Sequence, residues 1–265
     1  MWSRWIAATT LVVTACGVGA GTGHPNPEPG AVSVIRVIDG DSLLVETGTG
    51  RLEVRVVGVN APDRGECHHE AARDRLEEIV ENAVVTIARE GRDRFGRNLA
   101  RVFVDGSDMA LKMVRLGHGI AAPNAADPRS LLESEETAYR GRLGMWGGEC
   151  RSSTRAWVGF DIAAGDVDPP GPDGDLLHAE KVVVANFGDQ PADLSRWAIR
   201  DGSSRHRYHF TMGTVLAPGG RLEVASSSPG WVPGGVPVWS NSGDVAILLD
   251  DTGKVVDRWR YAISR

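Results

Sequence analysis

The sequence predicts two consecutive β-rich regions, first a small barrel of strands with helices packed on it and then an all-β sandwich. Two observations support this prediction. Residues 31–150 mix strand patterns with three stretches of helical periodicity, whereas residues 155–265 contain short strand-like runs separated by Gly, Pro and Asp. A chain of 265 residues is also long enough to form two domains.

Residues 1–30 have the features of a targeting segment. Arg4 precedes an apolar or small stretch at 6–15, and Cys16 follows it. This stretch is shorter than the ~20 residues that span a bilayer, but it suits a signal-peptide core. Because VTAC at 13–16 resembles a bacterial lipobox, we expect lipidation of Cys16, with a plain secretory signal as the alternative. The Gly- and Pro-rich residues 17–30 then form a tether. The protein is therefore expected outside the cytoplasm, membrane-anchored or secreted.

The first region follows a strand-turn-strand order interrupted by helices. Hairpin turns are expected at 39–41 and 48–50. Strands are expected at 31–38, 42–47, 51–59, 84–90 and 97–106. Helices are expected at 66–83, at 108–117 with Ser107 as its cap, and from Asp127 to about Arg142. Five strands with interposed helices predict an α+β fold, an oligonucleotide-binding-type barrel with three helices.

The second region has the even spacing of short strands that is typical of a β-sandwich. Its expected strands lie within 156–162, 180–188, 195–202, 207–213, 220–226, 243–251 and 255–263. Five of the eight Trp residues lie here, and we expect them in the core: Trp157, Trp197, Trp231, Trp239 and Trp259. The acidic loop 163–175 lacks regular calcium-ligand spacing, so a solvated loop is expected there.

Charge and cysteine content limit the functions open to the chain. The net charge of −6 argues against a protein that coats polyanions, but it does not exclude a local basic site. Three cysteines are an odd number for an exported protein. Lipidation of Cys16 would leave Cys67 and Cys150, whose disulfide would close a long loop. The alternatives are two free thiols, or a metal site of Cys67 with His68 and His69, although that spacing fits no standard zinc pattern.

Three separate stretches concentrate carboxylate, amide and guanidinium side chains in short turn-like segments. They are DGDS at 39–42, VNAPDRGEC at 59–67 and DRFGR at 93–97. Each alone is typical of a polar turn, because Asp, Asn, Gly and Pro are ordinary turn residues. Two adjacent carboxylates in the first stretch repel each other unless a cation lies between them.

Together, in this order, these stretches resemble the thermonuclease family of staphylococcal-nuclease-like phosphodiesterases. The family pattern is an Asp-Gly-Asp-Thr turn, an arginine in an apolar strand, Asp-[Thr/Ala]-Pro-Glu, a helix, a Tyr/Phe-Gly-Arg turn and a helix ending near a Trp. This chain has VIDGDS, Arg55 in VRVVGV, NAPD, DRFGR with Arg97, and LGMW ending at Trp146. The resemblance covers about residues 32–147, and the family's fold is the barrel expected above.

The resemblance implies a role for each of these residues. Arg55 and Arg97 would clamp the phosphate, because a guanidinium matches it bidentately. Asp63 would activate or position the attacking water. Asp41, Asn60 and Asp39 would bind a hard divalent cation through oxygen, with Ca²⁺ expected and other divalent ions compatible. The implied substrate is DNA and/or RNA.

Three residues depart from the family pattern. Asn60 replaces a metal-ligating Asp, so one negative charge is lost, and Asp63 replaces a Glu that is longer by about 1.5 Å. Ser42 replaces Thr, a minor change. We therefore expect a weaker or differently metal-tuned nuclease. The alternative is a surface lipoprotein that binds nucleic acid with little or no catalysis.

Residues 155–265 resemble the lamin-tail domain, an immunoglobulin-like β-sandwich that bacteria often attach to secreted nucleases. The resemblance lies in residues 180–202, 210–224 and 238–261. This region shows no catalytic set, so we expect a binding or positioning module with an unidentified ligand in a monomeric protein. A third hypothesis is a structural surface protein in which the sandwich is the functional part.

Overall fold

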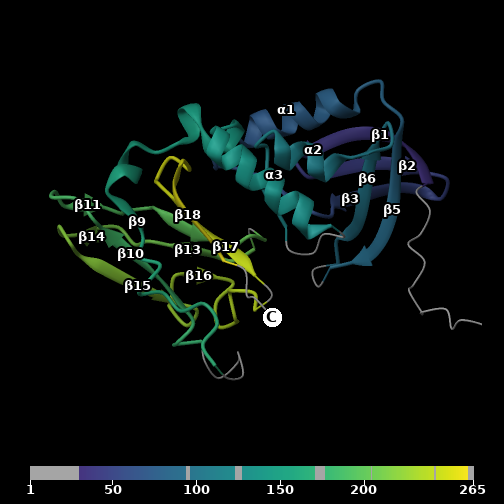
Figure 1. Ribbon diagram of the computed structural model, residues 1–265. Helices are drawn as coiled ribbons and strands as arrows, with labels where there is room; N and C mark the ends of the chain where they lie inside the picture. The colour runs from purple at the N-terminus through teal and green to yellow at the C-terminus, as the bar shows by residue number, and fades with distance from the viewer. Residues whose placement is uncertain are drawn as a thin grey trace, which may run out of the picture.

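The structure is a computed structural model that describes residues 30–93, 96–122, 127–170, 177–203, 205–241 and 243–261. Two β-rich bodies lie next to each other, with helices beside the first and between the two (Figure 1). The expected signal segment with Cys16, and Arg94 and Phe95 of the third motif, lie outside the described residues.

The first body is a closed five-stranded barrel. Its strands are β1 (Gly30–Asp39), β2 (Ser42–Thr47), β3 (Gly50–Val56), β5 (Val85–Arg92) and β6 (Asn98–Val104). They pair in the order β3-β2-β1-β5-β6, and parallel pairing of β3 with β6 closes the barrel. The short strand β7 (Ser107–Asp108) pairs antiparallel with β6, and β4 (Val59–Asn60) pairs with β8 (Ile120–Ala121). The fold class expected for this region is confirmed.

Three helices pack on the barrel: α1 (His69–Val80), α2 (Met109–Arg115) and α3 (Pro128–Gly141). The apolar faces of α1 and α2 complete the barrel core, with Leu76 and Met113 fully buried. The cap expected at Ser107 is wrong by one residue, because the Asp108 side chain accepts the Leu111 amide at 3.1 Å. Three short 3₁₀ helices follow: η1 (Gly144–Trp146), η2 (Gly148–Cys150) and η3 (Ser153–Ala156).

The second body consists of antiparallel sheets and confirms the predicted sandwich. One sheet has the order β16-β13-β12-β17-β18 and another has β15-β10-β9, while β11 pairs with β14. The strands are β9 (Val158–Phe160), β10 (Lys181–Asn186), β11 (Ala192–Asp193), β12 (Ala198–Arg200), β13 (Arg207–His209), β14 (Val215–Leu216), β15 (Arg221–Ala225), β16 (Trp231–Val232), β17 (Asp244–Leu249) and β18 (Val255–Tyr261). Four of the five Trp residues lie in the core, but Trp157 is 41% exposed.

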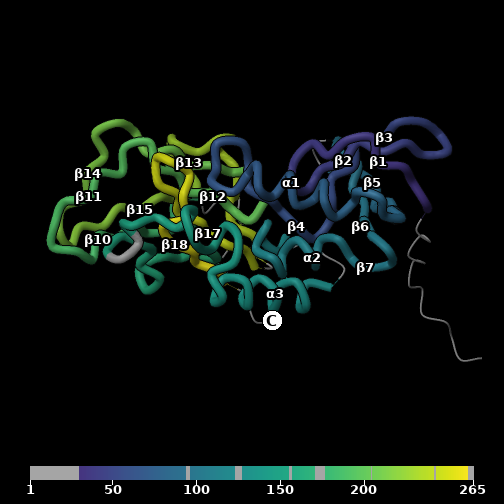
Figure 2. Tube along the Cα trace, turned by 90° about the horizontal axis from the view of Figure 1, so that it is seen from above, coloured from purple at the N-terminus to yellow at the C-terminus, as the bar shows by residue number. Residues whose placement is uncertain are grey.

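The two bodies share an interface that α3 and the sheet β17–β18 form. Trp146 and Ala138 pack there against Ile247 and Val255 in one buried apolar cluster. Figure 2 shows α3 running beside β17 and β18, next to the barrel. Glu135 of α3 is fully buried and accepts hydrogen bonds from Arg258 at 2.6 Å, from Arg260 and from the Ala121 amide at 2.7 Å. The second body is therefore fixed against the first.

A disulfide joins Cys67 to Cys150, with Cα atoms 5.3 Å apart, and closes a loop of 83 residues. This pairing is the one that the cysteine count predicted, and it ties the end of the VNAPDRGEC segment to η2. Within the described part of the chain, none of the helices has the length and apolar character needed to cross a membrane.

Candidate active site

The turn between β1 and β2 positions Asp41 at the end of the barrel. Gly40 is the residue that lets this turn lie against α1, since a Cβ there would be 2.6 Å from the Ala61 Cβ and 2.8 Å from the Ala72 Cβ. Asp41 is almost fully buried, and its Oδ2 accepts the Ala61 amide at 2.6 Å. This hydrogen bond connects the DGDS stretch at 39–42 to the VNAPDRGEC stretch at 59–67.

The two carboxylates of this turn have different environments. We predicted that Asp39 and Asp41 could share a cation, as they would if the chain were extended. The turn instead directs the Asp39 carboxylate back to its own backbone, where Oδ1 accepts the Asp41 amide at 3.0 Å. Asp41 is therefore the more direct candidate ligand, and Asp39 acts first as a turn residue.

Arg55 lies at the centre of the site. It comes from β3, whose residue Arg55 pairs with Ser42 of β2, and its guanidinium contacts both Asp41 Oδ1 and Asn60 Oδ1. The pKa of Arg55 is lowered to about 10, first by burial and then by the positive charge of Arg97, against the opposing effect of Asp39 and Asp63. Arg55 is still protonated at neutral pH, as a phosphate ligand must be.

Arg97 and Asp63 border this centre without contacting Arg55. The Arg97 side chain is only partly buried, and its Nε donates to Asp93 Oδ2 at 2.6 Å. Asp63 is half exposed and pairs with Arg207 at 3.4 Å. Both shift the pKa of Arg55 through space, Arg97 downward and Asp63 upward. The six predicted site residues of the barrel therefore lie in one neighbourhood: Asp39, Asp41, Arg55, Asn60, Asp63 and Arg97.

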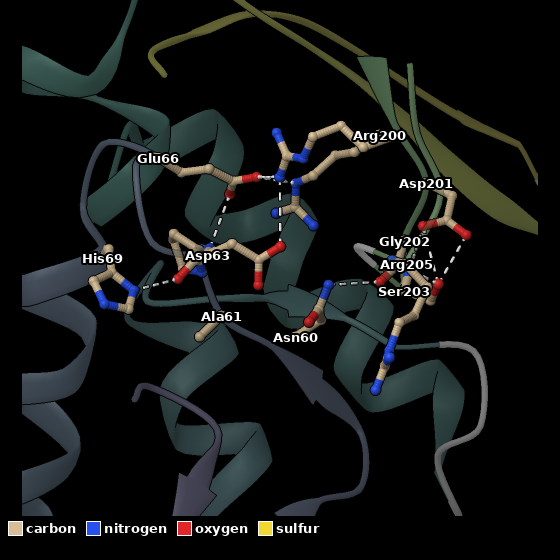
Figure 3. Close-up of polar contacts among 12 residues, drawn as sticks. Asn60, Ala61, Asp63, Glu66, His69, Arg200, Asp201, Gly202, Ser203 and Arg205 are labelled. Carbon is tan, nitrogen blue, oxygen red and sulfur yellow. Dashed lines mark hydrogen bonds and ion pairs between the residues drawn. The ribbon is translucent and has the colours of Figure 1, made fainter. Parts of the chain in front are cut away.

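Asn60 uses both ends of its side-chain amide. Its oxygen accepts from Arg55, and its Nδ2 donates to the Gly202 carbonyl of the second body at 3.0 Å (Figure 3). The residue is 1% exposed, so both bonds are shielded from water. An aspartate could make the first bond but not the second, because a carboxylate has no donor.

The predicted ligands fit a hard cation in chemical kind. The carboxylate oxygens of Asp41 and Asp39 and the amide oxygen of Asn60 are the donor types that calcium prefers. Arg55 faces the Asp41 and Asn60 oxygens and would compete with a cation for them. Among the residues that the structure describes, no cluster of three or more His, Cys, Asp or Glu side chains could hold a metal ion.

Sequence reasoning missed a buried ion-pair network beside Asp63. Glu66 is buried, its Oε2 accepts the Asp63 amide at 3.2 Å, and its Oε1 pairs with Arg200 at 3.1 Å and with Arg207. Figure 3 shows Glu66 and Arg200 facing each other across the two bodies. Arg200, in the buried strand β12, could have been noticed, since a charged residue in an apolar run needs a partner.

Comparison with known proteins identifies a family for each of the two bodies. Residues 53–148 match the model of the staphylococcal nuclease homologue family, and residues 161–262 match the lamin tail domain. An uncharacterized endonuclease of Haemophilus influenzae is 28% identical over 147 residues, which cover 55% of this chain and 80% of that protein.

Two further relatives are similar over less of this chain. An uncharacterized endonuclease of Escherichia coli O157:H7 is 33% identical over 114 residues, covering 43% of this chain and 74% of that protein. A micrococcal nuclease of Shigella flexneri is 30% identical over 124 residues, which cover 43% of this chain and 71% of that protein. The chain therefore belongs to the staphylococcal nuclease homologue family and continues into a lamin tail domain.

Proposed function

We propose that this protein is an endonuclease that hydrolyses phosphodiester bonds in DNA and RNA. The observation that supports it best is the position of Arg55, which contacts Asp41 and Asn60 and has Arg97 and Asp63 within electrostatic reach. Two guanidinium groups near a phosphate would offset the negative charge that grows on its oxygens in the transition state.

Each residue of the site has one task in this proposal. Arg55 and Arg97 bind and orient the scissile phosphate, and Asp63 accepts a proton from the attacking water or holds that water in line. Asp41, Asn60 and Asp39 would hold Ca²⁺ or another divalent cation, which supplies Lewis-acid polarisation of a phosphoryl oxygen when bound. A cation bound there would compete with Arg55 for the Asp41 and Asn60 oxygens.

The experiment that tests the proposal is digestion of plasmid DNA and of RNA by the mature protein, with Ca²⁺ and with a chelator. Arg97→Ala should lower kcat by roughly 10²–10³, since it removes one charge-stabilising donor. Arg51→Ala is the matched control, because Arg51 is highly exposed near the start of β3. If wild type and Arg97→Ala leave both substrates equally intact with every divalent ion tried, the enzyme proposal is lost.

A second candidate function is a surface protein that holds nucleic acid without cutting it. It is favoured by Asn60, whose neutral amide carries no negative charge for a cation and already bonds Arg55 and Gly202. Gel-shift binding of DNA by a wild-type protein that does not cleave it would support this candidate.

We further propose that the protein is exported and anchored by a lipid on Cys16, on the basis of the lipobox-like residues 13–16. Cys16→Ala should move the protein from the membrane fraction to the soluble extracytoplasmic fraction. Continued membrane retention of this variant would count against lipidation.

A further inference from the structure

In the part of the chain that the structure describes, the second body contacts the proposed nuclease site through residues 200–203 and 205–207, a segment between β12 and β13. The Gly202 carbonyl accepts from Asn60 at 3.0 Å, and Arg207 pairs with Asp63 at 3.4 Å. Both partners are residues of the proposed site. A pocket of about 340 Å³ lies at the same junction, lined in part by Asp63, Glu66 and Arg207.

This segment is held in place by its own domain. Asp201 accepts the Ser203 amide at 3.1 Å and lies 2.7 Å from His206 Nδ1. The Gly202 amide donates to Asp244 at 2.9 Å, and a Cβ on Gly202 would come within 2.5 Å of that carboxylate, so only glycine fits. The loop therefore presents a preformed acceptor, the Gly202 carbonyl, to Asn60 of the barrel (Figure 3).

Arg207 contacts both ends of the Asp63–Glu66 turn. The same nitrogen, Nη2, pairs with the Asp63 carboxylate and with the buried Glu66 carboxylate. Glu66 in turn accepts the Asp63 amide, and the Glu66 amide donates to the Asp63 carbonyl at 2.9 Å. Because Glu66 is fixed, Arg207 is fixed with it, and the half-exposed Asp63 side chain has a defined partner.

This segment contacts two of the predicted site residues, Asn60 and Asp63, and these are the two main departures from the family pattern. The amide of Asn60 is required because Gly202 offers an acceptor. The shorter carboxylate of Asp63 is the one that Arg207 pairs with. Contacts with the second domain therefore explain both departures, so that Asn60 and Asp63 need not be two independent losses of a family residue.

We propose that Arg207 is a positioning residue of the nuclease reaction and acts by orienting the Asp63 carboxylate, so that the lamin tail domain forms one wall of the nuclease site. This inference rests on the proposed function. It makes the second domain part of the catalytic unit.

The test is a double-variant cycle in the full-length protein on a DNA substrate. Arg207→Gln should lower kcat roughly tenfold to a hundredfold with KM little changed, because Asp63 is misplaced while the phosphate ligands are not. In an Asp63→Asn background the same substitution should change kcat by less than about twofold, since its target is already gone. Arg207→Lys should restore part of the lost kcat.

Glu136→Gln is the matched control, because it removes an ion pair with Arg258 of 2.6 Å at a distant part of the same interface. It should leave kcat at the wild-type value. Equal losses from Arg207→Gln in both backgrounds, or no loss at all, would overturn the inference while the proposed function stands. If Arg207→Gln does not fold, the inference is tested on Arg207→Lys, whose kcat should fall while its KM stays near the wild-type value. A wild type that cleaves no substrate overturns the proposed function and the inference with it.

Discussion

At the scale of single residues, one side chain contacts both the site centre and the second domain. Asn60 links the buried guanidinium of Arg55 to the Gly202 carbonyl. An amide is the small side chain that accepts at one end and donates at the other. The residue therefore contributes to the stability of the domain arrangement as well as to the proposed cation site.

Asn60→Asp should lower the free energy of unfolding by about 1–3 kcal/mol, because a carboxylate oxygen would face the Gly202 carbonyl without a donor. The measurement is urea unfolding in the presence of a chelator, so that metal binding does not offset the loss. Asn98→Asp is the control, since Asn98 also donates to a carbonyl, that of Glu53 at 3.0 Å, at a more exposed position. Equal stability changes in the two variants would contradict this role of Asn60.

At the level of elements, the turn that follows α2 lies against the chain that follows α3 and against the residue that precedes α1. Gly117 has φ +77°, and a Cβ there would lie 2.3 Å from the Leu143 carbonyl oxygen, so this turn needs glycine. The turn directs His118 Nδ1 to within 3.0 Å of His68 Nε2. Burial lowers the pKa of His118 to about 4, with His68 and Arg75 acting in the same direction and Glu78 opposing them, and burial also lowers the pKa of His68.

This histidine pair should make stability depend on pH. The unfolded chain binds a proton at His118 near pH 6.5, whereas the folded chain binds it only near pH 4. The free energy of unfolding should therefore be highest above pH 6.5 and fall as the pH drops toward 4. The fall at His118 should be roughly 1 kcal/mol, because the ring is partly exposed to solvent.

Urea unfolding at several pH values measures this dependence. In His118→Gln, the slope between pH 6.5 and 4 should decrease. An unchanged slope would show that other groups dominate acid unfolding in this range.

At the scale of the whole molecule, the two bodies are joined by buried charge as well as by apolar contact. Glu135 is fully buried and binds Arg258 and Arg260 of β18, and the Arg258 guanidinium also lies 4.0 Å from the centre of the Tyr139 ring. Removing one partner of such a buried ion pair lowers the free energy of unfolding strongly, because the remaining charge is neither paired nor hydrated.

Glu135→Ala should lower the free energy of unfolding by roughly 3–5 kcal/mol, since it leaves Arg258 buried without its main partner. Glu133→Ala, on the exposed face of the same helix, should change it by less than about 0.5 kcal/mol. Thermal or urea unfolding of both variants measures the difference. Similar small losses in both would mean that the ion pair contributes little to the interface.

The local elements and the order of the motifs can be predicted from the amino-acid sequence alone. Strand alternation, helical periodicity and the cap and turn residues depend on neighbours a few positions away, so they can be predicted without the fold. The barrel, its three helices, the sandwich and the Cys67–Cys150 pairing follow from such patterns and from the cysteine count. The Ser107 cap was wrong by one position, because two adjacent residues could cap and only backbone geometry selects Asp108.

The surroundings of the proposed site depend on how the two domains pack, which the sequence patterns do not show. Gly202 and Arg207 lie more than 130 residues after Asn60 and Asp63, and nothing in the local pattern of either segment indicates that they meet. Their contact depends on the disulfide, the Glu135 ion pairs and the shared apolar cluster, which together set how the two domains pack. The sequence could therefore identify Asn60 and Asp63 as departures, but the reason for them lies in a domain interface that a one-dimensional pattern does not contain.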